Sequence, residues 1–117
     1  VDPNAILVGR CEHFLSANKD IDATIERLVA YGNAGADCLY APGVTEPAHI
    51  EAIVKAVAPK AVNVLLMTPD MRASHLQSLG VRRASVGGRL ARTAWNAFDE
   101  AAGLLMREGR LPPQSYR

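Results

Sequence analysis

Residues 5–12 read AILVGRCE, an apolar run that ends in an arginine and, two positions later, a glutamate. The apolar residues 5–8 have no helical spacing, which is typical of a strand buried on both faces. Charged side chains directly after such a strand indicate an anion site at the strand's end. Arg10 and Glu12 are therefore the first candidate site residues.

The rest of the chain repeats this layout of a short strand followed by a helix. We predict strands over residues 5–8, 37–41, 61–67 and 83–86, and helices over residues 20–33, 47–58, 71–79 and 90–107. Asp20 or Asp22 can cap the first helix, and Gly35, Gly80 and Gly109 follow three of the helices. Each strand-helix unit spans roughly 25 to 30 residues, which implies parallel strands joined by right-handed crossovers. Residues 110–117 are predicted to form a loosely ordered tail.

These units predict an α/β fold in a single partial domain over residues 1–117, built from four β/α units. Two architectures fit this pattern. One is a small open sheet with helices on both faces, which the chain length favours. The other is half of an eight-unit barrel, which needs about 250 residues in full.

Composition excludes several classes of protein. The chain has 117 residues, of which 49% are hydrophobic and 21% charged, and its formal net charge is +1, so no nucleic-acid or membrane partner is implied. No apolar run approaches the ~20 residues of a membrane span. Cys11 and Cys38 both fall within or next to predicted strands, which favours buried, reduced thiols and a cytoplasmic protein.

Several stretches together carry a family resemblance: GRCE at residues 9–12, IERLVAYGNAGADCLYAPG at 25–43, VNVLL at 62–66, and LGVRRASVGG at 79–88 followed by LAR. In this order the chain resembles the C-terminal half of the isocitrate lyase and phosphoenolpyruvate mutase superfamily. The resemblance implies strands five to eight of a TIM-type (β/α)8 barrel, whose active site lies at the C-terminal mouth of the strands.

The resemblance also implies chemistry. Members of this superfamily use magnesium to cleave or rearrange C–C or C–P bonds beside a 2-oxo or enolate group in small carboxylates and phosphonates. Their magnesium ligands and mobile catalytic loop lie in the first half of the barrel, so we expect Mg²⁺ as cofactor with no metal ligand in this chain, and no activity from this chain alone. Members often read ARTD or ARVE where this chain has GRCE. Pro42 stands near the position of a glutamate in the lyases and a histidine in the mutase.

The resemblance and the local pattern assign roles to six residues. We expect Arg10 and Asn63 to bind the substrate; the alternatives are an ion pair of Arg10 with Glu12 and an Asn63 amide satisfied by backbone. We expect Glu12 to support the site by orienting the arginine or a metal-bound water. Ser85, Gly87 and Gly88 resemble the turn after strand eight, where backbone N–H groups hold an anion, although a close-packed turn explains the glycines equally well.

The predicted half-barrel would leave its first and fourth strands with unpaired edges. Such edges favour association, so we expect a homo-oligomer or pairing with the remainder of a longer chain. Trp95 and Phe98, three residues apart in the last helix, indicate a packing face and a candidate subunit contact. The competing functional hypothesis is a non-catalytic α/β binding or scaffold module derived from the same fold.

Overall fold

The computed structural model describes residues 2–17 and 19–113. The chain divides after Ser85 into two compact units, which are described in turn. Of the tail predicted over residues 110–117, residues 110–113 form neither helix nor strand, and residues 114–117 lie outside the described residues.

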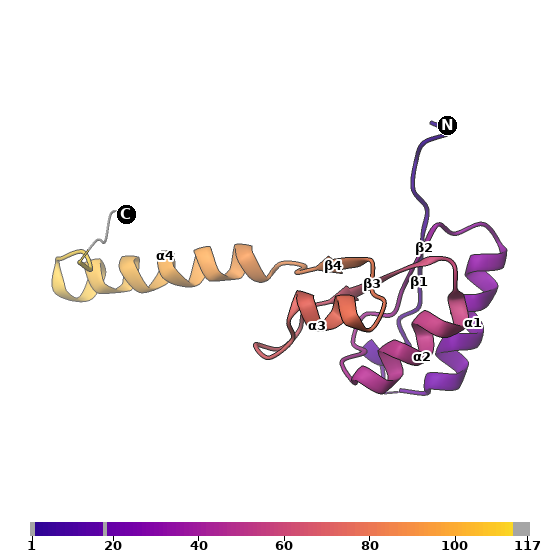
Figure 1. The fold of residues 1–117 in the computed structure, drawn as a ribbon. Coiled ribbons are helices and arrows are strands. Elements are labelled where there is room, and N and C mark those ends of the chain that lie inside the picture. The colour runs from indigo at the N-terminus through magenta and orange to yellow at the C-terminus, as the bar shows by residue number, and fades with distance from the viewer. Residues whose placement is uncertain (1, 18, 114–117) are drawn as a thin grey trace. The chain divides into compact units, whose positions relative to one another are not determined.

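The described part of the first unit has four strands that alternate with helices. Its elements are β1 (Val8–Arg10), the short 3-10 helix η1 (His13–Leu15), α1 (Ile21–Asn33), β2 (Cys38–Tyr40), α2 (Pro47–Val57), β3 (Ala61–Leu65), α3 (Ala73–Ser78) and β4 (Arg83–Ser85). All neighbouring strands pair in parallel, in the order β1-β2-β3-β4 (Figure 1). The predicted parallel α/β class is therefore confirmed.

The hydrophobic core lies between the sheet and the helices. Leu39, Val62 and Val64 point from β2 and β3 into this core, where they join Leu28 of α1 and Ile50 of α2. Side chains alternate along a strand, so the residues between them face the other side of the sheet. An added Cβ at Gly9 would lie 2.8 Å from Cβ of Tyr31, so β1 and α1 also meet on the core side.

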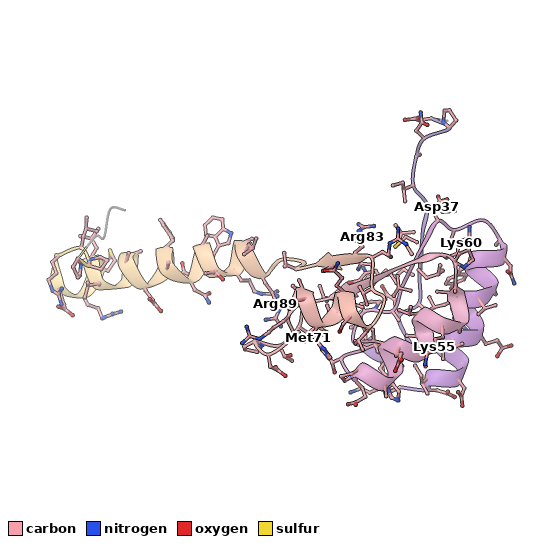
Figure 2. All side chains as sticks on the ribbon, viewed as in Figure 1. Asp37, Lys55, Lys60, Met71, Arg83 and Arg89 are labelled. Atoms are coloured by element: carbon pink, nitrogen blue, oxygen red, sulfur yellow. The ribbon has the colours of Figure 1, made fainter. Side chains whose placement is uncertain are left out.

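The opposite face of the sheet carries a different set of side chains. At the N-terminal ends of the strands, this face borders an open hollow of about 590 Å³ lined by Ile6, Val8, Asp37, Cys38, Ala61 and Arg83. Asp37 and Arg83 are labelled in Figure 2. Cys38 is buried but lies outside the core cluster. Sequential strand order and a core on one face match a partial barrel, and they disfavour an open sheet with helices on both faces.

The first strand begins later than predicted. Pairing with β2 starts at Val8, which is in register with Cys38, and continues to Arg10, in register with Tyr40. Before it, the N–H of Leu7 donates to Oδ2 of Asp37 at 2.8 Å, which holds the chain beside β2 without extending the strand. The expectation that residues 5–8 are buried on both faces is wrong, because Ile6 and Leu7 are exposed. Because the strand begins at Val8 and pairs with β2 up to Arg10, Arg10 is its last residue and does not follow the strand.

The helix signals were read correctly. Asp20 caps α1 by accepting a hydrogen bond from the N–H of Ala23 at 3.0 Å. Gly35, Gly80 and Gly109 all have positive φ after the helices that they follow.

The second unit contains α4 (Arg89–Glu108), which ends at the left-handed Gly109. Apolar side chains on this helix are exposed, among them Leu90, Trp95, Phe98 and Met106. The rings of Trp95 and Phe98 meet edge to face, with centroids 6.1 Å apart. None of the helices in residues 2–17 and 19–113 is long and apolar enough to cross a bilayer.

Candidate functional site

Arg10, Tyr40 and Asn63 lie in one row across the sheet, at the ends of β1 and β2 and in β3. Arg10 of β1 is in register with Tyr40 of β2, which is in register with Asn63 of β3, and the register continues to Arg83, the first residue of β4. Ser85 of β4 pairs with Leu65, two residues beyond Asn63 and on the same face. The row thus contains two of the candidate residues, Arg10 and Asn63, with Tyr40 between them and with Ser85 hydrogen-bonded to Asn63. Their roles in a site stay a prediction.

Arg10 makes two contacts at the end of β1. Its Nε lies 2.7 Å from Oε1 of Glu12, in an ion pair whose side chains are 48% and 63% exposed. Its guanidinium carbon lies 5.2 Å from the centroid of the Tyr40 ring, within the range of a cation–π interaction. The ion pair that the sequence offered as an alternative is therefore present. Because it is exposed, it contributes at most about 1 kcal/mol to stability.

Asn63 is the buried polar residue of the row, with 3% of its surface exposed. Its Nδ2 donates to Oγ of Ser85 at 3.0 Å. Its Oδ1 has no hydrogen-bond partner among the described residues. The alternative of an amide satisfied by backbone is therefore wrong, and one end of a buried amide is left for a group that the described residues do not supply.

Ser85, Gly87 and Gly88 stand at the end of β4 and the start of α4. The carbonyl of Ser85 accepts a hydrogen bond from the N–H of Leu66 at 2.8 Å, which ties the ends of β3 and β4 together. Gly87 has φ of 52°, which favours glycine, and Gly88 is the N-cap residue of α4. An added Cβ at Gly88 would meet only Nη1 of Arg92, at 3.9 Å. Close packing therefore does not explain the glycine at position 88.

The loops after β1 and β2 pack against each other beside the row. Gly43 has φ of 95°, and a Cβ there would lie 2.7 Å from the carbonyl oxygen of Phe14 in η1. The Phe14 ring also meets the His49 ring edge to face, with centroids 6.0 Å apart. Thr24, fully buried, donates to the carbonyl of Asp20 at 2.6 Å, and its Oγ1 lies 3.4 Å from Nδ1 of His13. These contacts fix the segment that carries Glu12.

Comparison with known proteins identifies the chain's relatives. Residues 2–106 match the family described as Phosphoenolpyruvate phosphomutase. The chain belongs to this family. The resemblance read from the sequence is thereby confirmed.

Individual relatives agree with the family. An oxaloacetate decarboxylase of Pseudomonas aeruginosa PAO1 is 37% identical over 83 residues, which cover 70% of this chain and 28% of the relative. A crystal structure of a Burkholderia cenocepacia J2315 protein described as a lyase or mutase is 48% identical, with a TM-score of 0.83, over 90% of this chain and 38% of that one. Oxaloacetate acetylhydrolase, solved with its product oxalate, is 22% identical and shares the fold, with a TM-score of 0.80, over 93% of this chain and 38% of that one. The chain thus spans less than two fifths of each of these relatives.

Candidate metal ligands do not cluster in the described part of this phosphomutase-family chain. Within residues 2–17 and 19–113, no group of three or more His, Cys, Asp or Glu side chains is placed to hold a metal ion. Glu12, the carboxylate closest in sequence to the row, is paired with Arg10. The loop after β3 carries Asp70, where hydrogen bonds from the Thr68 side chain and the Asp70 backbone lower the pKa of the carboxyl below its usual value.

Tyr40 was missed when the sequence was read for site residues. It is the last residue of β2 and is half-buried. Its position directly before Ala41, Pro42 and Gly43 places it at the end of a strand, as Arg10 is placed in β1. That signal was available, but an aromatic residue at a strand's end is more often read as packing than as part of a site.

Proposed function

We propose that this chain is the C-terminal half, strands five to eight, of a (β/α)8 barrel enzyme of the lyase and phosphonomutase type. The complete enzyme uses magnesium to cleave or rearrange a C–C or C–P bond in small 2-oxo carboxylates or phosphonates through an enolate. The chain supplies groups that bind and orient the substrate. Family membership and the row of Arg10, Tyr40 and Asn63 support this proposal.

The free end of the Asn63 amide is the observation that carries the proposal. A buried amide end without a partner costs about 1–3 kcal/mol, so it calls for a ligand. Since a serine hydroxyl can donate or accept, Ser85 can satisfy either end of the amide. The free end can therefore accept a hydrogen bond from a substrate hydroxyl or donate one to a carboxylate oxygen.

Arg10 has a separate role in the proposed reaction. Its guanidinium suits a planar carboxylate or a phosphonate, because both can accept two parallel hydrogen bonds from the same fork. Held at the strand's end, its positive charge stabilises the negative charge that develops as the enolate forms. Glu12 orients Arg10 through the pair with Nε. Pro42 stands near the position of the lyases' glutamate and the mutase's histidine, and it has no titratable group. None of the roles proposed for this chain needs a proton transfer at that position.

Magnesium is the proposed cofactor of the complete enzyme, with ligands supplied from outside the described residues. The chain's own residues act on the organic part of the substrate. We further propose that the unpaired edges of β1 and β4 are covered in the functional protein, either by a second copy or by the remainder of a longer polypeptide. Free Cys11 and Cys38 accord with a cytoplasmic location.

Oxalate, a mimic of a small enolate, tests the proposal. The complete gene product that carries this chain is titrated with oxalate by calorimetry, with and without Mg²⁺. We expect binding that requires Mg²⁺ and that weakens about 10-fold or more in Asn63→Leu, since a lost hydrogen bond to a charged group is worth ~1.5–3 kcal/mol.

Asn33→Leu is the matched control, because Asn33 is exposed at the C-terminal end of α1, where the chain returns to the start of β2 and not to the strand ends that carry the row. It should bind oxalate as the wild type does. A folded gene product that ignores oxalate in the presence of Mg²⁺ would contradict the enzyme proposal and favour a non-catalytic binding or scaffold module.

A further inference from the structure

Tyr40 occupies the centre of the polar row. It is the register partner of Arg10 on one side and of Asn63 on the other. Its carbonyl accepts a hydrogen bond from the N–H of Cys11 at 2.9 Å, so pairing between the two chain segments continues one residue past Arg10. The backbone therefore fixes where the Tyr40 ring stands relative to Arg10.

The ring and the carboxylate of Glu12 hold different parts of the same guanidinium. Glu12 takes Nε at 2.7 Å, and Tyr40 lies 5.2 Å from the central carbon. An ion pair between exposed side chains is weak and leaves a long arginine with much of its rotamer freedom. A second contact, with a half-buried ring on a paired strand, restricts that freedom.

The contact with Glu12 decides which N–H donors of Arg10 remain free to bind an anion. A guanidinium has five N–H donors in one plane, and Glu12 lies at the one on Nε. Of the four donors on the terminal nitrogens, one N–H on Nη1 and one on Nη2 point the same way, at the end of the guanidinium opposite Nε. An arginine held in this way presents a two-pronged end to a carboxylate or phosphonate.

We propose that Tyr40 is a positioning residue for the acidic group of the substrate. Its ring holds the Arg10 guanidinium so that the Nη1 and Nη2 end is available before the substrate arrives, which lowers the ordering cost of binding. The effect belongs to the ring and not to the phenol hydroxyl. This inference rests on the proposed function, since it takes Arg10 as the group that binds the anion.

Oxalate binding to the complete gene product in the presence of Mg²⁺ provides the first test. Tyr40→Leu should weaken binding about 5-fold, which corresponds to ~1 kcal/mol for a partly exposed cation–π contact. Tyr40→Phe should stay within about 2-fold of the wild type because it keeps the ring. Tyr31→Leu, which removes a half-buried tyrosine on the core side of the sheet, should leave the affinity unchanged.

A double-mutant cycle separates positioning from a general structural effect. If Tyr40 acts through Arg10, then Tyr40→Leu should have no further effect on oxalate affinity in an Arg10→Met background. The same 5-fold loss in both backgrounds would overturn the proposal, and so would equal losses for Tyr40→Phe and Tyr40→Leu.

NMR of the arginine side chain tests the contact without any ligand. The Hε proton of Arg10 should resonate upfield in the wild type and in Tyr40→Phe, because a proton near the face of an aromatic ring is shielded, and should move downfield in Tyr40→Leu. An Arg10 signal that is the same in all three proteins would overturn the positioning role even if oxalate bound. Absence of oxalate binding together with the expected NMR shifts would instead refute the proposed function and leave the contact between Tyr40 and Arg10 intact.

Discussion

The Nδ2 of Asn63 donates to Oγ of Ser85 across β3 and β4 at 3.0 Å, while Oδ1 of the same buried amide has no hydrogen-bond partner among the described residues. An apolar residue of similar volume at position 63 would avoid this cost, because it has no polar atom to leave without a partner. A sequence that keeps an unsatisfied amide here has exchanged some stability for a polar group at the end of the sheet.

Replacing this amide should therefore stabilise the chain while removing its ligand contact. We expect Asn63→Leu, which has similar volume, to raise the free energy of unfolding by about 1 kcal/mol, since it deletes a buried unpaired group. The only partner that it leaves without a hydrogen bond is the Ser85 hydroxyl, which is half-buried. Urea denaturation followed by circular dichroism measures the change. A loss of stability greater than 1 kcal/mol would show that the amide is structural.

Removing the other partner should have the opposite sign. Ser85→Ala leaves both ends of the Asn63 amide without a partner, and we expect the free energy of unfolding to fall by about 1–2 kcal/mol. Ser78→Ala is the matched control, because the Ser78 hydroxyl donates to the carbonyl of His75 at 2.7 Å in an exposed setting where water can replace it. Equal effects at the two serines in the same urea titrations would refute the claim that burial sets the cost.

The contact between Gly43 and Phe14 should make position 43 intolerant of any side chain. Gly43→Ala must adopt φ of 95° and also place its Cβ 2.7 Å from the Phe14 carbonyl oxygen. Gly35 has a similar φ of 107° but nothing within 4 Å of an added Cβ, so Gly35→Ala isolates the backbone strain of ~1–2 kcal/mol. Thermal unfolding should show Gly43→Ala to be less stable than Gly35→Ala by a further ~1–3 kcal/mol for the overlap. Equal melting temperatures would mean that the two loops move apart without cost.

Much of this fold could be predicted because local rules and tertiary packing agree. Asp20 caps the first helix and Gly35 follows it, and both signals are independent of distant contacts. The start of β1 could not be predicted, because the ladder begins where Val8 meets Cys38, and that register depends on a strand thirty residues away. Apolar character alone extended the strand back to residue 5, although Ile6 and Leu7 are exposed.

For the candidate site, too, some features could be predicted from the sequence and others could not. Arg10, Asn63 and Ser85 could be chosen as candidates because a polar residue inside or at the end of an apolar strand stands out in the sequence, and their roles in a site stay a prediction. The partner of each was not predictable. That Asn63 bonds to Ser85, and that Tyr40 lies between Arg10 and Asn63, follows from the relative register of β2, β3 and β4.

Arg10 should matter for binding far more than for stability. We expect Arg10→Met to weaken oxalate binding to the complete gene product roughly 100-fold, given ~3 kcal/mol for charge-assisted hydrogen bonds, with unfolding free energy within about 0.5 kcal/mol of the wild type because the ion pair is exposed. Arg27→Met, at an exposed position on α1, controls for the loss of one positive charge. Unchanged affinity in Arg10→Met would remove Arg10 from the site.

Self-association should depend on the apolar side of α4. Phe98 is 62% exposed and meets Trp95 edge to face, which leaves a large aromatic surface in contact with water. We expect light scattering of the wild-type protein to give a mass above that of one chain, and Phe98→Lys to lower it. Asn96→Lys adds the same charge to the same helix two residues earlier, about 200° around the axis, and should leave the mass unchanged. A monomeric wild type, or an equal effect of both lysines, would show that this aromatic pair serves no subunit contact.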